Sequence, residues 1–279
     1  MKKLITQQYQ LLNTWLQLRK TTLPGNIKKD VFRIFKDCYK LIEKKNNGEI
    51  TCQIGNYKMR SPDPTVLQLL LREIMINETY LINLDNKEPL IIDCGSNIGF
   101  SILYFKIKYP NAQIIGIEAN PDTFKILQEN VKQFEKVTLY NNFVSNVSNS
   151  HADLYTYGAG DVSASHNTER GGGNKNIVET ISLKDLVADK KIDLLKMDIE
   201  GGEIFIFNSQ ENTAYLDHVK NILLEYHHMF ENGHPLNSLS DFLSVFEKND
   251  FIYNLITEKI QRPFPYFQDI FFIMKSKKF

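Results

Sequence analysis

The stretch LIIDCGSNIGFS, residues Leu90 to Ser101, decides the fold of this 279-residue chain. Its apolar run ends in the acid Asp93, and Gly95 and Gly99 follow before a helix-like segment begins. This pattern is typical of a buried strand that turns tightly into a helix. We therefore expect backbone amides and one carboxylate to surround a small cavity at this turn.

The chain after this turn alternates between strand-like and helix-like segments. The strand-like segments are almost wholly apolar, which is typical of a parallel sheet covered by helices on both faces. Asn120 and Pro121 mark one helix start, because Asn caps helices and Pro suits the first turn. The sequence thus predicts a doubly wound α/β fold with a mostly parallel sheet. The expected strands are 90–93, 113–118, 137–141, 192–198, 221–226, 251–256 and 269–275, and the expected helices are 97–109, 121–134, 202–216 and 238–249.

A different pattern precedes this alternation. Apolar residues recur at helical spacing in two segments, which are separated by a turn at Pro24-Gly25-Asn26. Residues 50–59 then alternate about Gly55-Asn56, which indicates a β-hairpin. We expect residues 1–60 to form a small cap of helices and a hairpin, and residues 61–279 to form the main domain. The apolar helical positions are Ile5, Tyr9, Leu12 and Leu16 in the first helix and Phe32, Phe35, Tyr39 and Ile42 in the second.

The composition disfavours several classes of protein. The chain has 33 basic and 33 acidic residues, so no net charge would draw it onto nucleic acid, and a small or neutral partner is expected. Its cysteines, Cys38, Cys52 and Cys94, form no CxxC pair, which favours a reducing compartment and a cytoplasmic location. We expect no transmembrane segment, because no run of about 18 apolar residues occurs.

Two cofactors compete for the turn after Asp93. A dinucleotide such as NAD favours the spacing G-x-G-x-x-G, but no glycine stands between Gly95 and Gly99, and Asp93 would place a negative charge beside the pyrophosphate. S-adenosylmethionine has no phosphate and carries an ammonium and a sulfonium, so an acid is tolerated. Glu118 comes nineteen positions after Gly99, where a carboxylate accepts hydrogen bonds from ribose hydroxyls in either class of enzyme. The combination of these features favours S-adenosylmethionine.

Three blocks of sequence together resemble the FkbM-type S-adenosylmethionine-dependent methyltransferases. The blocks are IIDCGSNIGFS, IIGIEANPDTFKILQENV and IDLLKMDIEGGEIFIF, and the resemblance covers about residues 61–228. It implies a Rossmann-like class I methyltransferase domain, and it does not extend to the N-terminal helices.

The resemblance also implies the residues that bind the cofactor. Glu118 would hold the ribose, and Asn142 would lie near the adenine. Tyr80, together with Glu78, would close over the methionine end, although Tyr80 is equally expected as a core aromatic residue. The residues that would hold the methionine part are Asp93, Gly95, Asn97 and Gly99.

Methyl transfer to a hydroxyl is helped by a group that accepts the proton, or by a metal ion. Alternation places Lys196, Asp198 and Glu200 on one side of a strand whose carboxyl end lies near Asp198. Asp198 is therefore the first candidate for base or metal ligand, and Glu200 is expected to cap the next helix. His227, which shares a strand face with Glu225, is the second catalytic candidate. Asp198, Glu225 and His227 form the candidate ligand set for a divalent metal ion.

Residues 144–178 interrupt the alternation with a segment rich in Gly, Ser and Asn. Short strands are expected near 154–157 and 178–181, with a long loop between them. Long loops in compact domains are often functional or disordered. Asp161, His166 and Arg170 would belong to a lid over the acceptor, or else to a surface insertion.

The resemblance implies O-methylation of a sugar hydroxyl in a glycan or natural product. Two other classes stay open: a nicotinamide-dependent oxidoreductase on the same fold, and a relative that binds the cofactor without catalysis. The sequence does not select the acceptor, the oligomeric state or the role of the N-terminal helices.

Overall fold

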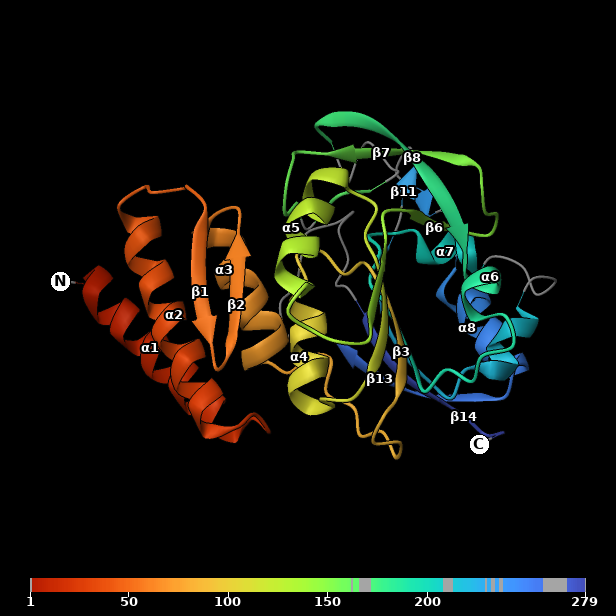
Figure 1. Ribbon diagram of the computed structural model, residues 1–279, viewed down its shortest axis with the longest axis horizontal. Helices are drawn as coiled ribbons and strands as arrows, with labels where there is room; N and C mark the ends of the chain where they lie inside the picture. Colours follow the sequence, from red (N-terminus) through yellow and green to blue (C-terminus); the bar gives the residue numbers. More distant parts are fainter. Residues whose placement is uncertain are drawn as a thin grey trace.

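The structure is a computed structural model, and it describes residues 2–161, 163–165, 172–207, 213–228, 230–231, 234–235, 238–257 and 270–278. A seven-stranded sheet lies at its centre, in the order β13-β14-β10-β9-β3-β4-β5 (Figure 1). Neighbouring strands from β10 to β5 run parallel, and β14 runs antiparallel to both of its neighbours. The strands are β3 (Leu90–Cys94), β4 (Gln113–Ile117), β5 (Val137–Tyr140), β9 (Leu194–Met197), β10 (Asn221–Tyr226), β13 (Phe251–Thr257) and β14 (Ile270–Ser276).

Both faces of this sheet are buried. Successive side chains of a strand point to opposite faces, so neighbouring residues enter different apolar clusters. Ile91 belongs to one apolar cluster and its neighbour Ile92 to the other. Helices α4 (Phe100–Lys108) and α5 (Pro121–Val131) pack in the first cluster, and α8 (Leu239–Lys248) packs in the second. The predicted α/β fold with a mostly parallel sheet is confirmed.

The strand order reverses beside β3, which fixes where a ligand can bind. From β3 the chain moves outward to β4 and β5, and it later returns to add β9 and β10 on the other side of β3. In open parallel sheets, ligands bind outside the carboxyl ends of the strands at this type of reversal. The predicted helix start at Asn120 lies at this edge, where the Asn120 side chain accepts hydrogen bonds from the backbone N–H groups of Asp122 and Thr123.

The N-terminal cap packs against α4 and α5, on the side of the sheet away from α6 and α8 (Figure 1). One apolar cluster runs without interruption from Leu18 of the cap to Leu223 of the sheet. The Asn130 side chain of α5 adds a polar link, because it bonds to both the backbone N–H and the backbone carbonyl of Arg60. The division after residue 60 stays a prediction, and the cap shares its core with the main domain. The cap elements are α1 (Lys2–Lys20), α2 (Gly25–Glu43), β1 (Ile50–Ile54) and β2 (Tyr57–Ser61), and α3 (Pro64–Leu70) and the π-helix η1 (Leu71–Ile76) lead from them to β3.

Two regions differ from the expectations. The predicted helix over 202–216 is wrong, since α7 (Glu203–Ile206) is followed by a separate 3₁₀ helix, η3 (Ala214–His218). The segment after Asn142 contains more strand than expected: β6 (Phe143–Ser145), β7 (His151–Thr156) and β8 (Asn174–Ser182) form a small second sheet. The remaining elements are α6 (Leu183–Val187), β11 (Phe230–Glu231) and β12 (His234–Pro235). Among the residues described, no helix is both long and apolar enough to cross a membrane.

Candidate active site

A cavity of about 390 Å³ opens at the carboxyl ends of β3, β4, β9 and β10. Residues of η1 and of the segment after it line this cavity, and so do Asp161, Ser163 and Ala164. The size suits a small-molecule ligand. The predicted site residues that line it are Tyr80, Gly95, Asn97, Glu118, Asn142, Asp198, Glu225 and His227.

The turn after β3 packs tightly against the end of β9. Gly95 has φ +79°, and a Cβ atom placed there would lie 1.9 Å from the backbone oxygen of Asp198. Any larger residue would therefore have to displace the backbone that carries Asp198. Asn97 also has a positive φ, of 46°, which is unusual for a non-glycine residue and often marks a functional site.

Asp93 and Gly99 lie behind the cavity wall. Gly99 lets α4 approach α5, since its added Cβ would meet side-chain atoms of Leu127 and Val131 at 3.0 Å. Asp93 is fully buried, and its Oδ2 accepts hydrogen bonds from the hydroxyls of Ser96 and Ser101. Asp93 therefore stabilises the turn from inside the protein. Its charge was expected beside a ligand, but it is directed into the protein.

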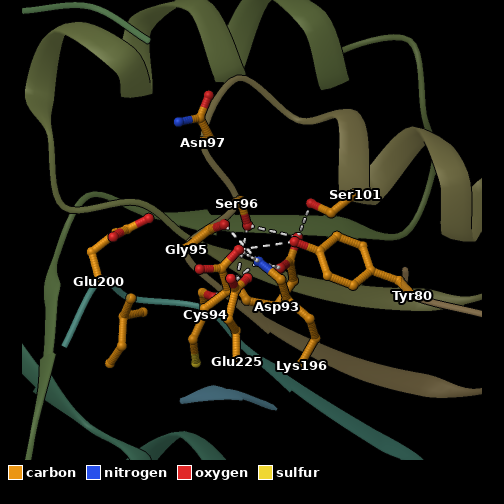
Figure 2. Close-up of polar contacts among 12 residues, drawn as sticks. Tyr80, Asp93, Cys94, Gly95, Ser96, Asn97, Ser101, Lys196, Glu200 and Glu225 are labelled. Atoms are coloured by element: carbon orange, nitrogen blue, oxygen red, sulfur yellow. Dashed lines mark hydrogen bonds and ion pairs between the residues drawn. The ribbon is translucent and has the colours of Figure 1, made fainter. Parts of the chain in front are cut away.

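Lys196 neutralises Asp93 at this position. Its Nζ lies 3.2 Å from Asp93 Oδ1 and 3.9 Å from Asp198 Oδ2, and it donates hydrogen bonds to the backbone oxygens of Cys94 and Gly95 (Figure 2). Burial alone would lower the pKa of Lys196, but Asp93 and Asp198 raise it above the ordinary value. A buried ammonium thus joins the first turn to the end of β9.

Glu118 directly follows β4, and both of its carboxylate oxygens face backbone amides. Its Oε2 accepts from the N–H of Asn97 at 2.9 Å, and its Oε1 accepts from the N–H of Asn120 at 2.8 Å. Burial raises the pKa of Glu118 to about 7. Each oxygen can accept a further hydrogen bond, so the carboxylate can bind a pair of ligand hydroxyls.

Tyr80 and Asn142 both line the cavity and come from distant segments of the chain. The Tyr80 ring is buried and its hydroxyl donates to Asp198 Oδ2 at 2.9 Å, so the residue is at once a core aromatic and a part of the cavity. Figure 2 shows the ring pointing toward the group formed by Asp93 and Lys196. The Asn142 amide donates to the backbone oxygen of Glu179 at 3.3 Å.

Glu78 lies elsewhere. Its carboxylate accepts from the N–H and the hydroxyl of Thr22 and from the hydroxyl of Tyr104. It is not among the residues that line the cavity. The expectation that Glu78 closes over the ligand is therefore wrong, and its contacts instead fix the end of α1 to α4.

His227 lies close to the other catalytic candidate, Asp198, and to several further acids. The side chain is 1% exposed, and its Nε2 lies 3.9 Å from Asp198 Oδ1 and 3.6 Å from both Glu200 Oε2 and Glu225 Oε1. Its Nδ1 lies 3.2 Å from Oε1 of Glu203, a residue that the sequence patterns did not single out. The imidazole thus spans from a buried acid to the cavity.

The expected capping role of Glu200 is wrong. The N-cap of α7 is Gly202, which makes no side-chain cap bond, and Glu200 has φ +55°. Its carboxylate belongs instead to the cavity wall.

Glu73 completes the acidic wall, although sequence reasoning missed it. It belongs to the π-helix η1, a type of helix that often occurs at functional sites. Burial raises the pKa of Glu73 to about 7, and burial and Asp198 raise that of Glu225 well above its ordinary value. Both shifts favour the protonated form of these carboxyl groups, relative to an exposed glutamate.

Two overlapping sets of side chains in this wall could hold a metal ion. One contains Asp198, Glu200 and His227, and the other contains Glu73, Asp198 and Glu225. Within each set the potential ligand atoms lie within 4.8 Å of one another. The predicted ligands Asp198, Glu225 and His227 thus do not form a single set. Asp198 belongs to both sets, His227 to the first and Glu225 to the second.

The Gly-rich segment contributes to the cavity through its first residues. Asp161, Ser163 and Ala164 line the cavity, and the Ser165 hydroxyl donates to the backbone oxygen of Glu200 at 2.7 Å. The other residues expected in the lid, His166 and Arg170, lie outside the described residues.

The strand order and the site at the reversal beside β3 define a Rossmann-like class I methyltransferase fold. The chain belongs to the methyltransferase FkbM domain family, which matches residues 93–277. It is 27% identical to methyltransferase sdnD of Sordaria araneosa, over 57% of this chain and 74% of that protein. It is 25% identical to methyltransferase 1 of Beauveria bassiana, over 57% of this chain and 73% of that protein.

Solved structures resemble the chain at lower identity. The FkbM methyltransferase of Methylobacillus flagellatus is 13% identical with a TM-score of 0.44, and the match covers 88% of this chain and 60% of that one. TYW2 of M. jannaschii, solved in complex with AdoMet, is also 13% identical, with a TM-score of 0.42 and coverage of 82% and 86%.

Proposed function

We propose that this methyltransferase transfers a methyl group from S-adenosylmethionine to a hydroxyl oxygen of a sugar, in a glycan or a natural product. The observation that carries the proposal is that one cavity is lined both by Glu118, at the end of β4, and by Asp198 and His227, beyond the ends of β9 and β10. The first group suits a ribose, and the second suits the removal of a hydroxyl proton.

The chemistry of the lining residues fits this cofactor. Its electrophilic methyl group is carried on a sulfonium, and the cavity wall supplies anionic groups that favour a cationic ligand. Glu118 would hold the ribose hydroxyls, Asn142 would lie beside the adenine, and Gly95, Asn97 and Tyr80 would surround the methionine part. Asp93 and Gly99 would act from behind the wall by fixing the turn.

The chain's own residues would prepare the acceptor. A hydroxyl becomes a competent nucleophile when a base removes its proton, and Asp198 and His227 lie in the wall where such a base is needed. Tyr80 and Lys196 fix Asp198 through the contacts described above. Much of the rate enhancement would come from holding the acceptor oxygen in line with the methyl carbon.

The charges in the cavity favour neutral acceptors over anionic ones. Carboxylates outnumber basic groups among the described lining residues, and the ammonium of Lys196 is engaged by Asp93. Phosphorylated acceptors would meet repulsion from Asp198 and Glu200. The cytoplasmic location stays a prediction from the cysteine pattern.

Methyl transfer can be tested with radiolabelled S-adenosylmethionine. We expect label to enter neutral glycosides or hydroxylated natural products and to enter their phosphorylated forms poorly. Calorimetry should show heat with S-adenosylmethionine and none with NAD. Binding of NAD alone would support the oxidoreductase alternative, and tight cofactor binding without transfer to any acceptor would support a relative without catalysis.

Addition of a chelator separates a base from a metal site. If Asp198 and His227 act by accepting the proton, transfer should continue at an unchanged rate after treatment with EDTA. A loss of activity that Mg²⁺ or Mn²⁺ restores would instead assign Asp198, Glu200 and His227, or Glu73, Asp198 and Glu225, to a divalent ion.

A further inference from the structure

We propose that Glu203 is a positioning residue that fixes the imidazole of His227, so that Nδ1 carries the proton toward Glu203 and Nε2 faces the cavity as the proton acceptor. The catalytic consequence rests on the proposed function. The orientation and protonation of the ring do not, and they can be measured without an acceptor.

The carboxylate of Glu203 is held rigidly at the start of α7. It is fully buried, its Oε1 accepts from the N–H of Ile199 at 2.8 Å, and its Oε2 accepts from the N–H of Gly201 at 2.9 Å. These amides belong to the segment in which Glu200 and Gly201 have positive φ angles. Because each of its oxygens faces a backbone donor, the Glu203 carboxylate is placed as a hydrogen-bond acceptor.

This acceptor fixes the protonation of the neighbouring ring. Nδ1 of His227 lies 3.2 Å from Oε1 of Glu203. Because a carboxylate cannot donate, Nδ1 must be the donor, and a neutral imidazole then has its lone pair on Nε2. Nε2 is the nitrogen that lies closest to Asp198, Glu200 and Glu225 at the cavity. The arrangement of carboxylate, imidazole and substrate site is that of an oriented general base.

Comparison with Asp198 indicates which of the two candidates takes the proton. Asp198 already accepts the Tyr80 hydroxyl at 2.9 Å and lies 3.9 Å from the Lys196 ammonium, and both contacts stabilise its charge. The Oδ2 of Asp198 is therefore already engaged as a hydrogen-bond acceptor. The proton of the acceptor hydroxyl would thus pass to Nε2 of His227, and Asp198 would stabilise the imidazolium that forms. The proton would then leave to water as product is released.

The test compares Glu203→Gln with Glu247→Gln, a matched change at an exposed acid on α8. Glutamine keeps the shape of Glu203 but loses its charge and places an N–H₂ group against a backbone donor. We expect kcat to fall about 10- to 100-fold in Glu203→Gln, with unchanged affinity for S-adenosylmethionine. Glu247→Gln should behave like the wild type.

The pH profile adds a readout that a structural role would not move. The imidazole must be neutral to accept a proton. Among the described residues, the titratable groups that face it are Asp198, Glu200, Glu203 and Glu225, and Glu73 and Lys196 also lie in the cavity wall. Removal of the Glu203 charge destabilises the imidazolium. The acid limb of kcat/KM should therefore move to lower pH in Glu203→Gln.

Nitrogen-15 NMR of histidine-labelled protein tests the ring directly. In the wild type, the His227 signal, assigned by its absence in His227→Gln, should show a protonated Nδ1 and an unprotonated Nε2 at high pH. A protonated Nε2 overturns the proposal even if Glu203→Gln does not fold. So does a folded Glu203→Gln variant with wild-type kcat, or one with low kcat and an unmoved acid limb. If the wild type binds no S-adenosylmethionine, the proposed function fails while the NMR result still decides the orientation.

Discussion

Replacement of Asp198 by alanine is expected to lower the rate of methyl transfer by at least about a hundredfold. The variant removes the anion that faces Nε2 of His227, and it leaves the Tyr80 hydroxyl without its acceptor. Lys196 keeps its contact with Asp93, so the turn that would bind the cofactor should persist. Affinity for S-adenosylmethionine, measured by calorimetry, should therefore change little.

Two further variants sharpen this result. Asp198→Asn keeps the volume and can still accept from Tyr80, so it isolates the loss of charge. Asp37→Ala, at an exposed acid of α2 that pairs with Lys40, is the matched control and should retain full activity. A folded Asp198→Ala variant with wild-type kcat would exclude Asp198 from the chemistry, whether as anion or as metal ligand. Equal losses of cofactor affinity and activity would assign it to binding instead.

The sequence predicted the sheet because its signals are local and strong. Nearly continuous apolar runs, such as Leu90–Ile92 in β3 and Leu194–Leu195 in β9, are typical of strands that are buried between two layers of helices. The helix start at Asn120 and Pro121 likewise depends on adjacent residues alone. Such features predict where elements begin and which edge of the sheet carries the polar ends.

The predicted helix over 202–216 failed because one periodic pattern covers two separate helices. α7 ends at Ile206 and η3 begins at Ala214, and the positive φ angles of Glu200 and Gly201 lie before both of them. Helical periodicity of the apolar residues was therefore a weak guide. The break after α7 leaves Glu203 in a short helix, where its carboxylate accepts hydrogen bonds from the backbone N–H groups of Ile199 and Gly201 in the segment before the helix.

The roles of the buried charges could not be predicted from spacing. Alternation placed Lys196 and Asp198 on one side of β9, but it could not show that Lys196 would pair with Asp93 from a neighbouring strand. Glu73 and Glu203 come from a π-helix and from a helix start, which no period of two or 3.6 identifies. Pairing between segments distant in sequence decides which acids face a ligand and which support the wall.

Replacement of Glu118 by alanine is expected to weaken binding of S-adenosylmethionine by about 1 to 3 kcal/mol, because the ribose hydroxyls lose a buried acceptor. The pKa of Glu118, raised by burial to about 7, adds a pH dependence. The carboxylate is the better acceptor, so affinity should be lost as the pH falls through 7 and should be about tenfold weaker at pH 6 than at pH 8.

Glu118→Gln and Glu129→Ala complete this test. Glutamine does not titrate, so Glu118→Gln should bind with an affinity that is weaker than that of the wild type and independent of pH across this range. Glu129 is an exposed acid on α5 that pairs with Lys132, and its replacement should leave the affinity unchanged. A folded Glu118→Ala variant that binds S-adenosylmethionine as tightly as the wild type would show that the ribose lies elsewhere. If the pH dependence disappears in Glu118→Gln, it belongs to the Glu118 carboxylate, because Glu73, whose pKa is also raised to about 7, still titrates in that variant.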